Sequence, residues 1–474
     1  MHHLRILAYL AWSIWGSALY ATPLQQEIDT LIEQSLPHAT IGVMIKDAQS
    51  GEILYARNTN KFLSPASNIK LLTAASALYY LGAEDKYITS LSQDKQHFYL
   101  SFSGSPALKT EDLKTLLGAL NPLGIHTISG NIFLDTSAFQ PPFHSPGASY
   151  DDLAWYFEAP STALILNENA AHYDFISAKK TGSPIEIKSI NSDSPLSLIN
   201  EVQTATLSDE KNHCGLNIDI QENNTLRLYG CIALDTHPKR MALAIPNPNV
   251  YAKNIIKKIL TEYHIDLQGQ VLDGQKPMHA KLIATHQSDP LKKLITHMLV
   301  ESDNLYADSL TKRLGRALTG QGTYKQGAYA IKKILKDHTH LDMHQIALSD
   351  GQGTRYNLIT PEQLMILLTD LYLDETIQPI LLSALPHMGV SGTLKDRMKK
   401  TPLENNVLAK TGSMHDISAL SGYLLMPKGK TIIFTIISNG IHDNLIKAKE
   451  LEDNILLTVY NRLNDDASHT DTLS

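Results

Sequence analysis

At both ends of the chain, apolar residues recur with the spacing typical of helices and strands. A long segment with a different residue pattern separates the two ends. Near the start, a helical pattern over Leu24–Leu36 is followed by strand-like runs at 41–47 and 52–58. Near the end, strand-like runs at 417–426 and 431–439 precede a long amphipathic helix. Terminal strands with helices between them predict an α/β domain that a large insert divides in two.

The insert extends from about Glu84 to about Ser288. Short alternating runs in it are separated by Gly, Pro, Asn and Ser, and a helical pattern at Tyr251–His264 interrupts them. This pattern of short alternating runs predicts a mainly β region. We therefore expect a discontinuous α/β domain over 22–85 and 286–463, an inserted mainly β region of one or two subdomains over 86–285, and a flexible tail over 464–474.

The first residues predict export. One fixed positive charge precedes an apolar run over Ile6–Trp15, and small residues follow, with cleavage expected after Ala18 or Ala21. These are the three parts of a secretory signal peptide, and the run is shorter than the ~20 residues of a membrane-spanning helix. An uncleaved N-terminal anchor is the alternative. No later segment has the pattern of a membrane span, so the mature protein is expected in the periplasm.

The chain has two cysteines, Cys214 and Cys231. Alternating runs at 216–221 and 225–231 flank a Glu222-Asn223-Asn224 turn, which predicts a hairpin. A turn centred between Glu222 and Asn223 places Cys214 directly opposite Cys231, and exported proteins meet oxidising conditions. A disulfide is therefore predicted, with two buried free thiols as the alternative.

Composition excludes several classes of function. The chain has 41 Lys and Arg against 48 Asp and Glu, a formal net charge of −7. This balance offers no basic surface for nucleic acid, and two cysteines are too few for a four-cysteine zinc site. His338, His340 and His344 fall on a polar stretch without acidic or cysteine ligands around them, so surface histidines are expected there rather than a metal site.

Three short motifs carry candidate chemistry. Ser67 and Lys70 stand three residues apart at the start of a predicted helix, where both side chains share one face. A serine there is a candidate nucleophile, and a lysine with a lowered pKa is a candidate base. The alternative is a helix-capping serine followed by a solvated lysine.

The second motif, Ser302-Asp303-Asn304, lies between helical stretches where a loop is expected. It offers a hydroxyl that can relay a proton and an amide that can bind a peptide group. The third, Lys410-Thr411-Gly412-Ser413, stands just ahead of a predicted strand. It combines a cation, two hydroxyls and a glycine that admits a substrate backbone. The alternatives are a helix-entry turn and an ordinary polar turn.

The order of these motifs resembles that of penicillin-binding proteins and class A β-lactamases. Further features resemble the class C low-molecular-mass penicillin-binding proteins. One is the wide spacing of 235 positions between Ser67 and Ser302. The others are the segments 102–108 and 128–135 and the segment Asp350-Gly351-Gln352-Gly353, which Arg355 and Asn357 follow. That family comprises D-alanyl-D-alanine carboxypeptidases and endopeptidases. The resemblance covers residues 25–463. Ser105 departs from it, because the family commonly has aspartate there.

The resemblance implies a fold and a set of roles. The fold is the α/β penicillin-binding-protein and β-lactamase type, split by the insert. Ser67 would be acylated with Lys70 as base, and Ser302 with Lys410 would protonate the leaving amine. Asn304 would hold the substrate amide, and Thr411 and Ser413 would bind the terminal carboxylate. Gly412 would let the substrate backbone come close. No metal or other cofactor is required.

The same resemblance implies the ligands. These are peptidoglycan stem peptides and, as covalent inhibitors, β-lactam antibiotics. Asp152 matches a family acid that meets the amino group of a diaminopimelate side chain, with Arg355 in the same pocket. A solvated surface pair is the alternative for Asp152. A β-lactamase or esterase, a catalytically silent cell-wall binding protein and a homodimer remain open at this stage.

Overall fold

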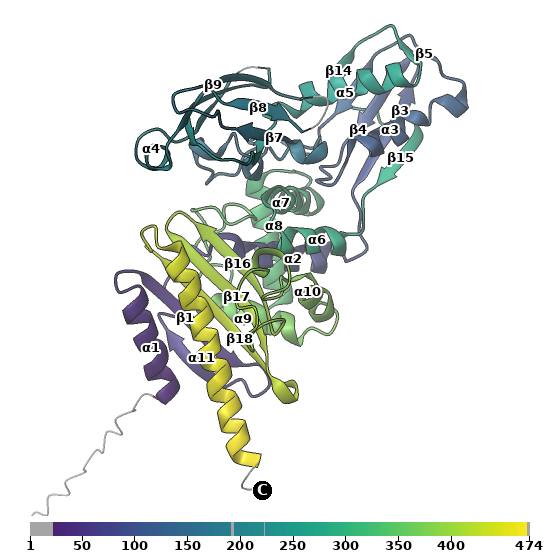
Figure 1. The fold of residues 1–474 in the computed structure, drawn as a ribbon. Helices are drawn as coiled ribbons and strands as arrows, with labels where there is room; N and C mark the ends of the chain where they lie inside the picture. Colours follow the sequence, from purple (N-terminus) through teal and green to yellow (C-terminus); the bar gives the residue numbers. More distant parts are fainter. Residues whose placement is uncertain (1–21, 191–193, 222, 472–474) are drawn as a thin grey trace, which may run out of the picture.

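The computed structural model describes residues 22–190, 194–221 and 223–471 (Figure 1). The predicted signal peptide, residues 1–21, lies outside the described residues. Within the described ranges, none of the helices combines the length and apolar character needed to cross a membrane.

Strands from both ends of the chain form one antiparallel sheet of order β16-β17-β18-β1-β2. Its strands are β1 (Thr40–Asp47), β2 (Ile53–Arg57), β16 (Val407–Met414), β17 (Ile417–Leu425) and β18 (Thr431–Asn439). The N-terminal β1 pairs with β18 along its whole length, from Thr40 opposite Asn439 to Asp47 opposite Ile432. This pairing confirms the predicted α/β domain that an insert divides.

Helices cover both faces of this sheet (Figure 1). One face packs on α1 (Pro23–Ser35) and α11 (Leu445–Asp471), and alternate strand residues such as Ile45 and Phe434 fill that core. The core on the other face includes residues of six helices: α2 (Ile69–Tyr80), α6 (Leu291–Val300), α7 (Asn304–Thr319), α8 (Tyr324–His338), α9 (Pro361–Leu373) and α10 (Gln378–Ala384). Residues 69–78 of α2 are all buried, including the polar Lys70, Thr73 and Ser76, and the others are apolar, as expected for a helix in the core.

The insert forms two further sheet-containing units beyond α7 and α8 (Figure 1). The first has a sheet of order β14-β6-β4-β3-β15, whose core includes residues of α3 and α5. Its elements are β3 (Ile88–Asp94), β4 (His97–Ser101), α3 (Thr110–Gly118), β6 (Ile132–Asp135), α5 (Pro248–Glu262), β14 (Val271–Asp273) and β15 (Lys281–Gln287), with the pair β5 (Thr127–Ile128) and β13 (Asp266–Leu267) beside them.

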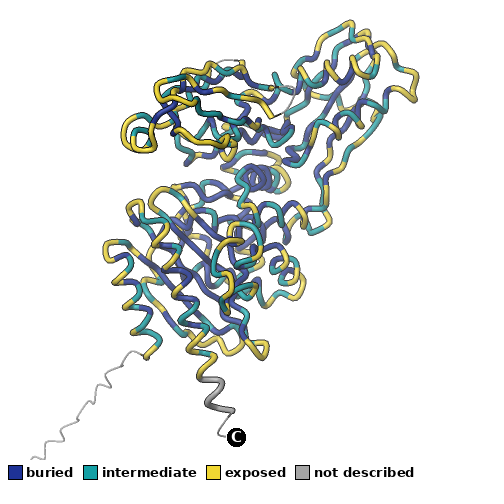
Figure 2. The backbone as a smooth tube through the Cα atoms, viewed as in Figure 1, coloured by how far each residue is buried: buried dark blue, intermediate teal, exposed yellow. Residues whose placement is uncertain are grey.

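The second unit of the insert has two three-stranded sheets around a separate core, seen as a dark-blue interior in Figure 2. Its strands are β7 (Ala170–Ile176), β8 (Glu186–Ser189), β9 (Ser197–Ala205), β10 (Asn217–Ile220), β11 (Thr225–Ala233) and β12 (Lys239–Ala244), and the short helix α4 (Leu207–Asn212) joins β9 to β10. The predicted mainly β insert is confirmed, with two subdomains.

Cys214 and Cys231 form the predicted disulfide. The predicted register of the hairpin was wrong by one residue, because Asn217 pairs with Tyr229 and Ile220 with Leu226. The Gln221 N–H donates to the Thr225 carbonyl over 2.8 Å, so the turn is centred on Asn223. Cys214 lies beyond the end of the ladder and still reaches Cys231.

The chain end also differs from its prediction. The structure continues α11 to Asp471, whereas the sequence pattern placed the end of the helix at Leu463 and a flexible tail after it. The added residues are polar except for Ala467, and they include neither glycine nor proline, the residues that most often end a helix.

Removing the disulfide should destabilise the insert. The bond closes a loop with a sequence separation of 17, and the loss of such a loop returns entropy to the unfolded chain worth about 3 kcal/mol. The double variant Cys214→Ala/Cys231→Ala should therefore unfold at lower guanidinium concentration. Wild-type protein treated with a reductant should show the same shift, and an unchanged midpoint in both would contradict the prediction.

Candidate active site

Ser67 lies in a 3₁₀ turn, η1 (Ala66–Asn68), that leads into the buried helix α2. Two glycines pack against this turn. A Cβ added at Gly353 would lie 2.0 Å from the Ala66 carbonyl oxygen, and one at Gly412 would lie 2.6 Å from the Pro65 carbonyl oxygen. Gly412 is thus needed for the close approach of β16 to the candidate nucleophile, a reason that the sequence motif does not reveal.

Lys70 lies at the centre of the site. Its ammonium nitrogen is 2.8 Å from Ser67 Oγ and 2.7 Å from Asn304 Oδ1, and it donates to the Gln352 carbonyl over 2.9 Å. The side chain is fully buried. Burial lowers the pKa of Lys70 to about 8, although nearby carboxylates of Asp308, Asp303, Asp350 and Glu158 act in the opposite direction. A lysine with this pKa can be deprotonated near neutral pH and accept a proton.

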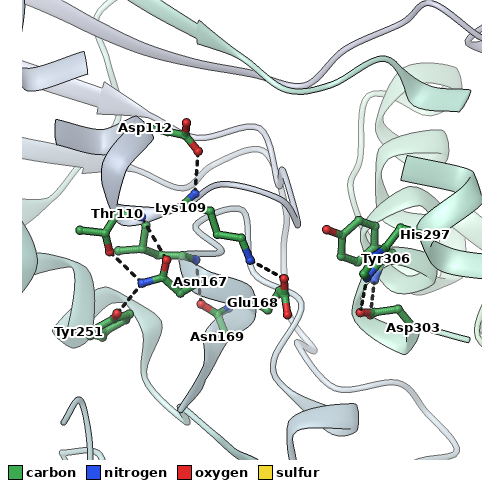
Figure 3. Close-up of polar contacts among 11 residues, drawn as sticks. Lys109, Thr110, Asp112, Asn167, Glu168, Asn169, Tyr251, His297, Asp303 and Tyr306 are labelled. Atoms are coloured by element: carbon green, nitrogen blue, oxygen red, sulfur yellow. Dashed lines mark hydrogen bonds and ion pairs between the residues drawn. The ribbon is translucent and has the colours of Figure 1, made fainter. Parts of the chain in front are cut away.

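The Ser302-Asp303-Asn304 turn connects α6 to α7 and brings its polar side chains to Lys70. Ser302 has a φ of 59°, a left-handed conformation that costs energy in a serine. Asp303 caps α7 by accepting from the Tyr306 N–H over 3.2 Å, and its second oxygen is 3.2 Å from His297 Nε2 (Figure 3). Asn304 Nδ2 donates to the Phe157 carbonyl over 2.9 Å. These contacts fix Ser302 and Asn304 in place.

Lys410 approaches from the opposite side. The prediction placed its motif ahead of a strand, and this was wrong, because the motif lies within the edge strand β16. Lys410 Nζ donates to Ser302 Oγ over 2.8 Å and to the Thr411 carbonyl over 2.8 Å. Burial, together with the neighbouring Lys70, holds the pKa of Lys410 well below its usual value. Two lysines therefore each touch one serine hydroxyl.

Thr411 and Ser413 follow Lys410 along β16. The Thr411 hydroxyl donates over 2.7 Å to the hydroxyl of Thr393. Thr393 belongs to the turn η6 (Gly392–Leu394) and was not predicted. Since hydroxyl and backbone N–H groups are suitable donors to a carboxylate, this edge of β16 can hold one.

A tight loop positions the third partner of Lys70. The Asp350 carboxylate is buried and accepts from the N–H groups of Gln352, Gly353 and Thr354 over 3.1, 2.8 and 3.2 Å. Asn357 Nδ2 donates to the same carboxylate over 2.9 Å. The loop thus turns the Gln352 carbonyl toward Lys70, which gives a structural reason for the segment that the sequence resemblance singled out.

A cavity of about 500 Å³ opens beside the nucleophile. Its walls include Ser67, Asn304, Ser413, Asp152, Glu158 and Arg355. Burial raises the pKa of Asp152, and the Arg355 charge acts against this increase. The structure therefore places Asp152 and Arg355 in one cavity with Ser67, although the two stand far apart in the sequence.

Glu158 also lines this cavity, and the sequence did not predict it. Its carboxylate lies 3.4 and 3.5 Å from the amide nitrogen of Gln352, and the residue is 9% exposed. Burial raises the pKa of Glu158 to about 7, and the charges of Asp152 and Asp350 add to the increase. A single glutamate that follows the aromatic segment Trp155–Phe157 does not indicate a functional site. Its burial depends on the loop around Asp350, which is distant in the sequence.

The described residues contain no cluster of three or more histidine, cysteine, aspartate or glutamate side chains that could hold a metal ion. Two of the three histidines considered earlier make other contacts. His340 Nδ1 lies 2.9 Å from Asp370 Oδ1, and His338 stacks on Tyr79 with ring centroids 4.7 Å apart.

A serine at the start of a buried helix, a lysine within hydrogen-bonding distance of it and a second serine–lysine pair define the site of a serine acyl-transfer enzyme. The sheet with helices on both faces gives the fold class, that of penicillin-binding proteins and β-lactamases. The fold class is as predicted.

The model of the D-Ala-D-Ala carboxypeptidase 3 (S13) family matches residues 24–458, so the chain belongs to that family. It is a serine carboxypeptidase of the class C low-molecular-mass penicillin-binding proteins. The chain is similar to "D-alanyl-D-alanine carboxypeptidase DacB" of Haemophilus influenzae, with 29% identity over 431 residues that cover 88% of this chain and 89% of the relative.

Two crystal structures of penicillin binding protein 4 from Haemophilus influenzae resemble this fold. The first has a TM-score of 0.82 and 28% identity, and it covers 91% of this chain and 99% of its own. The second, a complex with a β-lactam, has a TM-score of 0.78 and 28% identity over 92% and 99% of the two chains.

Proposed function

We propose that this protein hydrolyses peptidoglycan peptides as a D-alanyl-D-alanine carboxypeptidase and D,D-endopeptidase, through an acyl-enzyme on Ser67. One observation carries the proposal: a buried lysine with a pKa of about 8 lies 2.8 Å from the Ser67 hydroxyl. Membership of the family supports the substrate class.

In the proposed first half-reaction, Ser67 Oγ attacks the carbonyl carbon of the penultimate D-alanine while Lys70 accepts its proton. The backbone N–H groups of Ser67 and Ser413 stabilise the oxyanion, a contribution of about 3 kcal/mol per donor in a related case. The C–N bond then breaks, and the leaving amine receives a proton through Ser302, which Lys410 contacts. Asn304 holds the substrate amide, and Thr411 and Ser413 bind the terminal carboxylate.

In the second half-reaction, water attacks the ester and regenerates the Ser67 hydroxyl. Hydrolysis releases the shortened stem peptide. A β-lactam would acylate Ser67 in the same way, and the β-lactam complex of the similar Haemophilus influenzae protein supports this step. The Glu-x-x-Leu-Asn pattern that carries the deacylating base of class A β-lactamases is absent from the sequence after Asn304.

We place the diaminopimelate side chain of the substrate in the 500 Å³ cavity, with its amino group facing Asp152. A carboxylate suits that cation, and Arg355 can pair with the side-chain carboxylate. An Asp152→Ala variant should cleave diaminopimelate crosslinks less efficiently than wild type. Unchanged efficiency would contradict this assignment.

The affinity for such a substrate should depend on pH. The pKa of Glu158 is about 7 and that of Asp152 is raised, so the cavity gains negative charge as the pH rises from 6 to 8. The side-chain amine stays protonated over this range. The ionised fraction of a group of pKa 7 rises about tenfold from pH 6 to pH 8, so the KM for a peptide with a free amine should fall by up to about tenfold over this range.

The matched control is the same peptide with that amine acetylated, since effects of Lys70 ionisation are common to both peptides. Its KM should change little with pH. In the Glu158→Gln variant, the ratio of the KM for the acetylated peptide to the KM for the free-amine peptide should lose most of its pH dependence. An equal pH dependence for both peptides would show that the acidic pair does not bind the amine.

The proposed location is the periplasm, where the substrate is found and where a disulfide is stable. The signal peptide and its cleavage after Ala18 or Ala21 are part of this proposal. Mass spectrometry of the protein secreted by its host tests the cleavage site, and light scattering tests whether the mature chain is a homodimer.

The central test uses purified pentapeptide muropeptides. The wild-type protein should release D-alanine, and a fluorescent penicillin should label it but not its Ser67→Ala variant. Labelling without D-alanine release, together with fast turnover of nitrocefin, would instead indicate a β-lactamase. Absence of both labelling and release would indicate a cell-wall binding protein.

A further inference from the structure

A second cavity lies on the other side of the Ser302–Asn304 turn. It has a volume of about 230 Å³ and is enclosed by Tyr156, Phe157 and Glu168 of the insert and by His297, Glu301 and Ser302 of the catalytic domain. It shares Phe157 and Asn304 with the cavity beside Ser67, and it shares Glu168 and Ala170 with a third cavity of about 670 Å³ between the insert subdomains. The three cavities are therefore neighbours, in order from the nucleophile to the space between the insert subdomains, and the Asn304–Phe157 hydrogen bond lies between the first two.

Glu168 stands where the second and third cavities meet. Asn167, Glu168 and Asn169 have φ values of 52°, 61° and 47°, a run of left-handed residues without glycine. Figure 3 shows the contacts that hold this run: Asn167 donates to Thr110 and Tyr251 over 2.8 and 2.7 Å, and Lys109 pairs with Glu168. The same view places His297 and Asp303 opposite the Glu168 side chain.

The proposed chemistry assigns the two halves of the substrate to different cavities. The acyl half becomes bonded to Ser67, which lines the 500 Å³ cavity. The leaving amine takes its proton from Ser302, which lines the 230 Å³ cavity. The carboxylate next to that amine stays at Thr411 and Ser413, and the rest of the leaving half can extend past Ser302 toward Tyr156 and Glu168. A single D-alanine is small for such a path, whereas a second stem peptide would extend along it.

We propose that the 230 Å³ cavity and its continuation along Glu168 bind the leaving stem peptide of crosslinked peptidoglycan, with Tyr156 and Glu168 as specificity-determining residues. This proposal rests on the proposed function. It adds that the insert selects crosslinked stem peptides over single ones.

The chemistry of the walls fits a peptide. Tyr156 is 54% exposed and forms an edge-to-face pair with Phe157, with ring centroids 5.6 Å apart, so the rings offer an apolar surface to the aliphatic parts of the peptide. The Glu168 carboxylate can accept from backbone N–H groups. Beyond it, Lys109, Lys114 and Lys258 line the third cavity together with acidic residues, a mixed surface suited to a chain of amides and carboxylates.

The test compares two substrates that share one acyl half. In a pentapeptide monomer the leaving group is D-alanine, and in a crosslinked dimer it is a stem peptide. For Glu168→Ala and for Tyr156→Ala, kcat/KM on the dimer should fall about tenfold, whereas kcat/KM on the monomer should stay within about twofold of wild type. Tyr150→Ala is the matched control, because Tyr150 is 79% exposed and lies in the same segment as Tyr156. It should leave both rates unchanged.

The outcomes separate this proposal from the proposed function. Equal losses on monomer and dimer, or no loss on either, would overturn the subsite while leaving the hydrolase intact. A wild-type protein that cleaves neither substrate would overturn the proposed function itself. Dimers with and without their disaccharides form a last arm: a loss confined to the disaccharide-bearing dimer would show that the cavity binds sugar, and it would overturn the assignment to peptide.

Discussion

Replacing Lys70 by arginine is expected to reduce the acylation of Ser67 about 10³-fold to 10⁴-fold. Arginine keeps the positive charge but does not deprotonate in proteins, so it cannot accept the Ser67 proton. General-base catalysis contributes a factor of about 10² to 10⁴, and arginine would also disturb the short contacts that Lys70 makes with Ser67 and Asn304. The acylation rate of a fluorescent penicillin, measured by rapid quenching, gives the factor directly.

The pH profile distinguishes this role from a structural one. Because the pKa of Lys70 is about 8, the neutral, proton-accepting form becomes more abundant as the pH rises from 6 to 8. Wild-type acylation should increase over this range, and the residual rate of the arginine variant should not. A variant that is acylated within tenfold of wild type, with the same pH profile, would show that another group takes the proton.

Much of the catalytic centre could be predicted because its chemistry lies in short, ordered motifs. Ser67 and Lys70 are one helical turn apart, so local geometry alone brings them together. Lys70 also meets Asn304, and Lys410 meets Ser302, although each of these pairs is far apart in the sequence. Those contacts followed from the family resemblance and from no local pattern.

The errors have physical causes as well. The sequence pattern placed the motif of Lys410 just ahead of a strand rather than within one, because lysine and glycine are uncommon in strands. In the structure, β16 pairs with β17 along its length while Lys410 is buried against Ser302. Tertiary packing therefore overrides the local preference. Glu158 could not be predicted at all, because its raised pKa depends on burial beneath a loop that begins almost 200 residues later in the chain.

The cysteine hairpin shows how a local rule can fail while its conclusion holds. The sequence pattern places the centre of the turn between Glu222 and Asn223, whereas the observed centre is Asn223. This difference shifts the pairing of the two strands by one residue along the whole ladder. The disulfide nevertheless forms, because Cys214 precedes the paired residues and its backbone is free of their register. The carbonyl of Cys214 accepts from the Cys231 N–H, which keeps the two residues together beyond the last ladder pair.

A buried ion pair behind the active site should contribute strongly to stability. Arg397 Nη2 lies 2.7 Å from Asp453 Oδ1 and 3.0 Å from Glu452 Oε2, and the Glu452 side chain is 1% exposed. The second oxygen of Glu452 accepts from Ser418 over 2.6 Å. Arg397 thereby ties α11 and β17 to the segment that carries Thr393, the partner of Thr411.

Replacement of Arg397 by methionine, which retains much of the side-chain volume, should lower the free energy of unfolding by about 3–5 kcal/mol at pH 8, because it leaves the carboxylates of Glu452 and Asp453 without their partner. Burial already raises the pKa of Glu452 in the wild type, and loss of the arginine should raise it further. A raised pKa in the folded state favours the protonated form, so stability is retained at low pH and lost as the pH rises. The destabilisation should therefore be smaller at pH 5 than at pH 8.

The double variant Arg397→Met/Glu452→Gln separates the charge from the packing. It removes the more deeply buried carboxylate together with Arg397 and leaves Asp453, whose side chain is 12% exposed and whose pKa burial also raises. It should therefore recover part of the lost stability and depend less on pH between 5 and 8 than the single variant does. Urea unfolding, followed by hydrogen exchange of the α11 and β17 amides, locates the effect. If the single variant lost less than about 1 kcal/mol at pH 8, or if its loss were equal at both pH values, the buried pair would not hold α11 in place.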